Sequence, residues 1–135
     1  MSTISLLGAS KKTSKAISRI NRNSKLFKVI LQAVQEKKAE EIVSLDLRKI
    51  PEAVADFFII CQASSTTQVR AIADNVEHRV KELCLETPYR HEGMNALQWV
   101  LVDYVNIVVH VFQPETRKFY RLEEMWSDAE QQEHS

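Results

Sequence analysis

The chain has 135 residues, of which 44% are hydrophobic and 27% are charged, and its formal net charge is zero. These proportions are typical of a soluble globular protein with one well-formed core. No run approaches 18 apolar residues, which argues against a membrane span. Two cysteines, Cys61 and Cys84, fall in a predicted strand and on a predicted helix face, so we expect small buried residues in a reducing compartment and no disulfide framework.

The charges are distributed unevenly. Residues 1–35 contain seven Lys or Arg and no acid, whereas residues 36–135 hold eleven basic and eighteen acidic residues, a formal balance of −7. A basic arm on an acidic body favours a polyanion near the arm and a basic or neutral partner for the body.

Residues 1–23 are rich in Ser, Lys and Arg and lack a periodic apolar face, which predicts a flexible arm. Three interpretations stay open for it: a solvated tail without function, an organellar transit peptide, or a segment that contacts a polyanion such as RNA.

Ser24 is a good N-cap for a helix that continues to about Ala39, with apolar residues at three- and four-residue spacing. Residues 41–48 alternate in polarity and predict a short strand, which Ile50-Pro51 ends because Pro cannot donate to a strand ladder. Residues 56–62 form a continuous apolar run, which predicts a central strand covered on both faces.

The strongest helix signal follows. Ser65 and Gln68 have the spacing of a capping box, and apolar residues keep helical spacing as far as Cys84. A strand, a long helix and another strand are typical of a crossover unit. Thr87-Pro88 ends the helix, and a loop with Gly93 occupies residues 88–96.

Residues 96–112 are rich in Val and Ile with a polar break near Asn106, which predicts a hairpin turning at Val105-Asn106. This register pairs Val100 with Val111 and Val102 with Val109 on one apolar face, which we expect in the core. The opposite face pairs Trp99 with Phe112, Leu101 with His110 and Asp103 with Val108.

After the hairpin, Pro114-Glu115-Thr116 predicts a turn, residues 117–122 a short strand or extended segment, and Leu122 to Ala129 a short amphipathic helix. Residues 131–135 are expected to fray. The predicted fold class is α/β, a mixed β-sheet of four to five strands covered by helices, in one domain over residues 24–130.

Few groups suggest catalysis. The chain has no Gly-rich phosphate loop, no Cys-x-x-Cys and no His pair at helical spacing, and His91-Glu92 lacks a second ligand at suitable spacing. Asp46, Asp56 and Asp103 could converge at strand ends for metal-dependent phosphoryl transfer, but they lack the acid-x-acid spacing. We therefore predict a non-enzymatic protein without a cofactor or metal.

The polar hairpin face has two interpretations. A lone His on an apolar strand is more often a core residue satisfied by one hydrogen bond, and Asp103 is the diagonal neighbour that could supply it for His110. Trp99 could equally pack in the core or anchor a partner. Because no reaction machinery accompanies this face, it suggests a docking surface rather than an active site.

Three blocks of the sequence closely resemble the ribosomal silencing factor family, also called Iojap-like. They are Asp56-Phe57-Phe58-Ile59-Ile60-Cys61 with the following Gln68 to Glu77, the hairpin strands Trp99 to Tyr104 and Val108 to Phe112, and Tyr120 to Glu123 with Trp126. The similarity covers about residues 25–130 in order and with compatible spacing.

The resemblance implies a nucleotidyltransferase-like fold without catalysis. It implies binding to the large ribosomal subunit through ribosomal protein fourteen of that subunit, which blocks joining of the small subunit and represses translation when nutrients are scarce. The family motif maps the partner-contacting positions onto Trp99, Val100, Leu101, Asp103, Tyr104 and His110. A homodimer and a cytoplasmic location are further expectations. The basic arm lies outside the resemblance, and contact with ribosomal RNA is expected from its charge alone.

Two departures and two alternatives remain. The family usually has Gly where this chain has Val105, which leaves either the register above or a three-residue turn that exchanges the faces of the second strand. The family also commonly has Gly at Ala63. The alternatives are an organellar assembly factor of the large subunit, mitochondrial or plastid, with residues 1–23 as presequence, and a residual nucleotidyltransferase using Asp46, Asp56 and Asp103.

Overall fold

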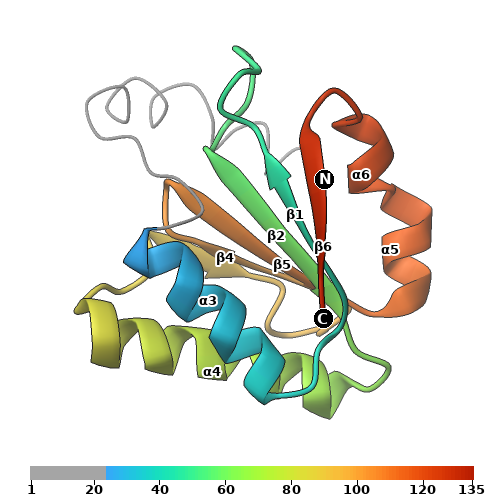
Figure 1. Cartoon of the computed structure of the whole chain (residues 1–135). Coiled ribbons are helices and arrows are strands. Elements are labelled where there is room, and N and C mark those ends of the chain that lie inside the picture. Colours follow the sequence, from blue (N-terminus) through green and yellow to red (C-terminus); the bar gives the residue numbers. More distant parts are fainter. Residues whose placement is uncertain (1–23) are drawn as a thin grey trace.

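A computed structural model describes residues 24–135; the predicted arm, residues 1–23, lies outside the described residues. In chain order, with the labels of Figure 1, the elements are α3 (Lys25–Glu36), β1 (Glu40–Asp46), β2 (Phe57–Gln62), α4 (Thr66–Cys84), β3 (Arg90–Glu92), β4 (Trp99–Asp103), β5 (Ile107–Phe112), α5 (Pro114–Tyr120), α6 (Leu122–Met125) and β6 (Glu130–His134).

The described strands form one sheet in the order β3-β4-β5-β2-β1-β6. β2 and β5 pair in parallel, and all other neighbours are antiparallel. The predicted mixed α/β fold is confirmed, with six strands rather than four to five. The parallel pair lies at the centre, where β2 is covered on both faces and has an unbroken apolar run.

The predicted hairpin register is confirmed from Trp99–Phe112 to Asp103–Val108. The turn keeps this register although Val105 has a φ of +73°, a conformation that β-branched residues resist. Asp103 Oδ1 accepts the Val105 N–H at 2.8 Å, and the Tyr104 carbonyl accepts the Asn106 N–H at 2.8 Å. The side chain of Asp103 therefore stabilises a turn conformation that glycine would adopt without strain.

The helices α3 and α4 lie side by side against one face of the sheet, which we call the α3/α4 face (Figure 1). Its core contains the residues that the hairpin pattern placed there, including Val100, Val102 and Val109. The two predicted N-caps are confirmed: Ser24 Oγ accepts the Phe27 N–H, and Ser65 Oγ accepts the Gln68 N–H. The Gln68 side chain donates to two carbonyls just after α3 instead of closing the capping box.

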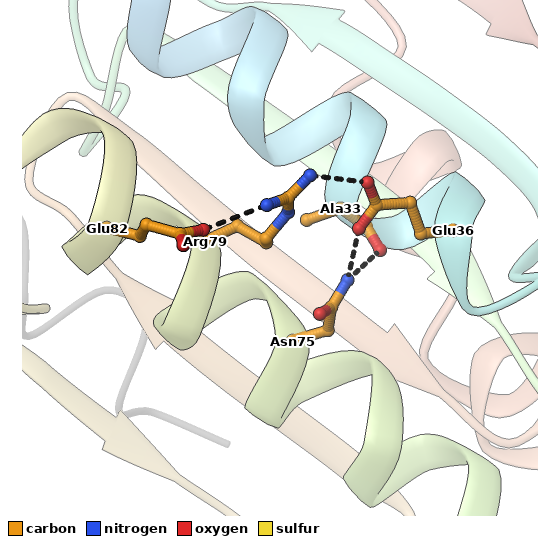
Figure 2. Close-up of polar contacts among 5 residues, drawn as sticks. All are labelled: Ala33, Glu36, Asn75, Arg79 and Glu82. Atoms are coloured by element: carbon orange, nitrogen blue, oxygen red, sulfur yellow. Dashed lines mark hydrogen bonds and ion pairs between the residues drawn. The ribbon is translucent and has the colours of Figure 1, made fainter.

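Polar contacts also join the two helices, as Figure 2 shows. Asn75 Nδ2 of α4 donates to the Ala33 carbonyl at 2.8 Å and to Glu36 Oε1 at 3.0 Å. Arg79 bridges Glu36 at 2.9 Å and Glu82 at 2.8 Å. These contacts fix the C-terminal end of α3 against the middle of α4.

The opposite face, the α5/α6 face, is covered by the short helices α5 and α6 and by the segment between β1 and β2. Arg117 of α5, 9% exposed, ties this layer to the sheet. Its guanidinium donates to the Glu41 carbonyl at 2.8 Å, to Gln62 Oε1 at 3.2 Å and to Glu123 Oε2 at 2.6 Å.

Three local predictions are wrong. Residues 131–135 do not fray: β6 pairs with β1, and His134 Nε2 hydrogen-bonds Ser44 Oγ at 2.9 Å. Residues 117–122 are mostly helical, because Pro114 starts α5 at its first turn instead of forming an isolated turn. The loop 88–96 contains β3, a polar edge strand without apolar alternation.

Candidate docking groove on the α5/α6 face

The hairpin distributes the six predicted contact residues over both faces of the sheet. Val100 and Tyr104 lie in the core of the α3/α4 face, whereas Trp99 and Leu101 lie in that of the α5/α6 face. Asp103 and His110 share the α5/α6 face by strand alternation. All six are buried, with Trp99 at 9% exposure and the others at 5% or less. The structure therefore brings four of them to one face and places two on the other.

Aromatic rings surround Trp99. Its indole stacks on Phe112 with ring centroids 4.8 Å apart and lies 4.7 Å from the ring of Tyr120. Tyr120 in turn meets Phe119 edge-to-face at 5.0 Å. Phe119 is 77% exposed, so a continuous row of rings leads from the core of the α5/α6 face to the surface of α5.

His110 is a core residue, as one interpretation of the sequence had it. The predicted hydrogen bond between His110 and Asp103 is wrong. The Trp99 Nε1–H donates to His110 Nδ1 at 3.1 Å, while Asp103 serves the Val105 turn. Complete burial lowers the pKa of His110 from 6.5 to about 3, because the protonated ring would lose its hydration. The imidazole is therefore neutral at physiological pH.

A groove of about 290 Å³ opens beside this cluster. Its walls come from the β3–β4 connection, β4 and α5, and they are formed by Glu92, Gly93, Ala96, Gln98, Trp99, Leu101, Thr116 and Tyr120. Gly93 has a φ of +87°, and a Cβ at this position would lie 2.0 Å from the Trp99 carbonyl oxygen. Only glycine allows the loop to approach β4 this closely.

The sequence predicted Trp99 and Leu101 of this groove and missed the contribution of α5. Thr116 and Tyr120 line the groove, and Phe119 lies next to it. The signal that could have found them is Pro114: as a first-turn residue it starts a helix in which positions 116 and 120 share a face.

The predicted carboxylate cluster has structural roles. Asp46 forms a two-point ion pair with Arg48 at 2.9 and 2.8 Å, and Asp103 accepts the Val105 N–H. Asp56 comes just before β2, where its backbone joins Leu47 and Asn106. Across residues 24–135, no group of three or more His, Cys, Asp or Glu is placed to hold a metal ion.

A second, larger hollow of about 600 Å³ is bordered by polar residues of β1, α5 and α6. Arg117 forms its inner wall, but this guanidinium already donates to three partners, as described above. The hollow combines Arg117, Lys118 and Arg121 with Glu41, Glu123 and Glu124, so neither sign of charge predominates.

None of the helices within residues 24–135 is long and apolar enough to cross a membrane.

Comparison with known proteins gives the family. Residues 20–135 match the family model described as "Ribosomal silencing factor during starvation". Proteins named ribosomal silencing factor RsfS from Halalkalibacterium halodurans and Bacillus subtilis are 41% and 39% identical, over 79% and 77% of this chain and 90% and 86% of theirs.

Solved structures agree with the sequence comparison. A crystal structure of a protein from Chromobacterium violaceum matches with a TM-score of 0.71 and 31% identity, over 76% of this chain and 83% of that one. One from Bacillus halodurans matches with a TM-score of 0.68 and 39% identity, over 77% and 95%. The resemblance seen in the three sequence blocks thus extends over the whole described fold, and the chain belongs to the ribosomal silencing factor family.

Proposed function

We propose that this protein binds the large ribosomal subunit through ribosomal protein fourteen and thereby prevents the small subunit from joining. The result is repression of translation under nutrient limitation. Family membership carries this proposal, because relatives at 41% and 39% identity are named ribosomal silencing factors. The mechanism is steric occupation of a surface and needs no turnover, cofactor or metal.

The groove beside Trp99 is the proposed contact surface. It presents an apolar floor of Trp99, Leu101 and Tyr120 with Glu92 at its border, and Phe119 extends it across α5. Aromatic residues of this kind dominate interface energies. Residues 36–135 carry a formal balance of −7, so a basic ribosomal protein is the complementary partner, and salt should slow association.

Of the six predicted contact residues, Trp99 and Leu101 line the groove. Asp103 would act by fixing the turn, and Val100 and Tyr104 by fixing β4 against α4, since all three are buried. A partner that inserts a side chain into the groove would bury the remaining surface of Trp99.

Sedimentation of purified ribosomal subunits tests the function directly. We expect the protein to co-migrate with large subunits and to reduce their joining with small subunits. A protein that neither co-migrates with large subunits nor reduces their joining would refute the proposal. Analytical ultracentrifugation of the same preparation tests the expected homodimer, and a truncated protein that lacks residues 1–23 tests whether the arm adds affinity for ribosomal RNA.

Trp99→Ala is the first variant to examine. We expect docking to weaken by about 2 kcal/mol or more, roughly thirtyfold, because the groove loses its wall. Some stability is lost as well, because the indole is mostly buried. The matched control is Val111→Ala, which lies opposite Val100 on β5 and packs on the α3/α4 face: it should lower the melting temperature without a change in docking of the folded protein. Equal docking by both variants would count against the groove.

An organellar role in assembly of the large subunit is the second candidate. A mouse relative named "Mitochondrial assembly of ribosomal large subunit protein 1" is 36% identical and the maize protein "Protein Iojap, chloroplastic" is 32% identical, but the matches cover only 32% and 42% of those proteins. We therefore propose a cytoplasmic location first. Intact-mass measurement on protein from native cells decides between them, because a presequence would be removed.

A further inference from the structure

His110 cannot touch a docking partner. It lies in the middle of β5 on the α5/α6 face, and its side chain is completely buried. Phe58 packs edge-to-face on its ring at 4.5 Å, and Phe112 lies parallel at 6.2 Å. Any part that this residue has in docking must therefore pass through a neighbour.

Within the described chain, the ring forms its hydrogen bond with Trp99. Its indole N–H donates to His110 Nδ1 at 3.1 Å. An indole nitrogen is a donor only, so His110 must be neutral with its own proton on Nε2. That Nε2–H has no hydrogen-bond partner among residues 24–135.

This arrangement is unfavourable for stability. A buried N–H without a partner costs free energy, and an apolar residue of similar size would avoid that cost in a pocket already lined by aromatic rings. What the imidazole adds is a hydrogen-bond acceptor that orients the Trp99 indole. Stacking on Phe112 and the tilted contact with Tyr120 restrain the plane of the Trp99 indole, and the hydrogen bond holds its N–H edge toward His110.

Trp99 lines the groove together with Leu101 and Tyr120, and its indole packs on the Tyr120 ring, so the orientation of the indole bears on the shape of the groove. We propose that His110 is a positioning residue of the docking site, whose Nδ1 holds Trp99 in the orientation that a partner requires. This inference rests on the proposed function, since it assigns His110 a part in docking at the groove.

Four variants separate this role from a structural one. His110→Leu removes the acceptor at similar size, whereas His110→Asn keeps a carbonyl oxygen near the place of Nδ1. Trp99→Phe keeps the stacked ring and removes the donor. Val109→Ile, on the neighbouring position of β5 but on the α3/α4 face, is the control for a change in strand packing.

All variants are made with Trp126→Phe, so that Trp99 is the one remaining indole of the two in the sequence. The first readout is the indole N–H signal of Trp99 by NMR with its hydrogen-exchange rate. The second is the dissociation constant for purified large ribosomal subunits. Melting temperatures are recorded in parallel.

We expect His110→Leu to melt at the same or a higher temperature, to speed indole exchange at least tenfold and to weaken docking about tenfold. His110→Asn should stay within about threefold of the parent in both readouts. Trp99→Phe should weaken docking to the same extent as His110→Leu, and the double variant no further, because both changes remove one interaction.

Unchanged indole exchange and docking in His110→Leu would overturn the proposal, as would fully additive losses in the double variant. Should His110→Leu fail to fold, the comparison of Trp99→Phe with His110→Asn decides in the same way. The two proposals fail differently. Docking that survives Trp99→Ala refutes the groove itself, whereas docking that is sensitive to Trp99→Ala but not to His110→Leu refutes only the positioning role.

Discussion

The two faces of one sheet differ in their cover. The α3/α4 face lies under helices of 12 and 19 residues, and its buried side chains are apolar apart from the phenol of Tyr104, the thiol of Cys61 and the hydroxyl of Ser44, which lies opposite Ile59. The α5/α6 face lies under helices of only 7 and 4 residues and holds the Trp99–His110 hydrogen bond beside an open groove. The longer helices leave the α3/α4 face closed, whereas the shorter ones leave a groove open on the α5/α6 face.

Ile59→Ala should give the largest effect, since this residue of β2 is fully buried on the α3/α4 face. We expect a loss of about 3 kcal/mol in the free energy of unfolding, from lost burial and the remaining cavity. Urea denaturation measures it. The folded variant should still dock with unchanged affinity; a specific loss of docking would show that the two faces are coupled.

Lowering the pH should reduce the free energy of unfolding through His110 on the α5/α6 face. Its pKa is about 3 in the folded state and 6.5 when unfolded, so between these values the unfolded chain binds the extra proton. Titration of His110 therefore leaves the free energy of unfolding unchanged above pH 6.5 and lowers it by about 1.4 kcal/mol per pH unit towards pH 3.

Unfolding measured from pH 7 to 4 checks this slope by comparison of variants. His110→Leu should flatten the curve, and His78→Gln, at an exposed position of α4, is the control for replacing a histidine elsewhere. An identical slope in the parent and in His110→Leu would show that another group is responsible.

Val105→Gly should stabilise the protein by about 1 kcal/mol, because glycine adopts a φ of +73° without the strain that valine suffers. Asn106→Gly is the control: Asn106 does not have a positive φ, so the same change there should only add flexibility to the unfolded chain. Thermal unfolding compares the melting temperatures of the two variants with that of the parent. If Asn106→Gly were stabilised as well, the gain could not be assigned to relief of strain at Val105.

Phe119→Ala should have the smallest effect on folding, within about 0.5 kcal/mol, because the ring is 77% exposed. If α5 is part of the docking surface, affinity for large subunits should nevertheless fall severalfold. Met125→Ala, at a residue that is 67% exposed on α6 but does not line the groove, should change neither quantity. Equal docking by the two variants would restrict the contact surface to β4.

The sequence predicted the strands with apolar side chains more completely than the polar edge strands. Strand alternation predicted the register that the hairpin has, although Val105 left a three-residue turn open as an alternative, and the capping residues Ser24 and Ser65 marked the helix starts. These features depend on local chemistry. The strands β3 and β6 were missed because Arg-His-Glu and Glu-Gln-Gln-Glu-His are edge strands, which pair through their backbone and need no apolar side chains.

The candidate docking groove could be predicted from the sequence only in part. Trp99 and Leu101, which the sequence proposed as partner contacts, line the groove, but burial of His110 depends on Phe58 and Phe112, and burial of Trp99 depends on Tyr120 of α5. No pattern within residues 96–112 reports what a helix further along the chain will cover. For the same reason, the sequence could not distinguish a residue that contacts a partner from one that orients the contact.

The parallel pair at the centre of the sheet has a consequence for the order of folding. Phe57 pairs with Ile107, and α4, β3 and β4 all lie between them in the chain. Such distant partners meet late, because closing a long loop costs entropy before any contact repays it. The β4–β5 hairpin can form from adjacent segments, and β2 then joins it. We therefore expect the rate-limiting step to be the insertion of β2 beside β5, and substitutions in β2 to slow folding more than equally destabilising substitutions in β6.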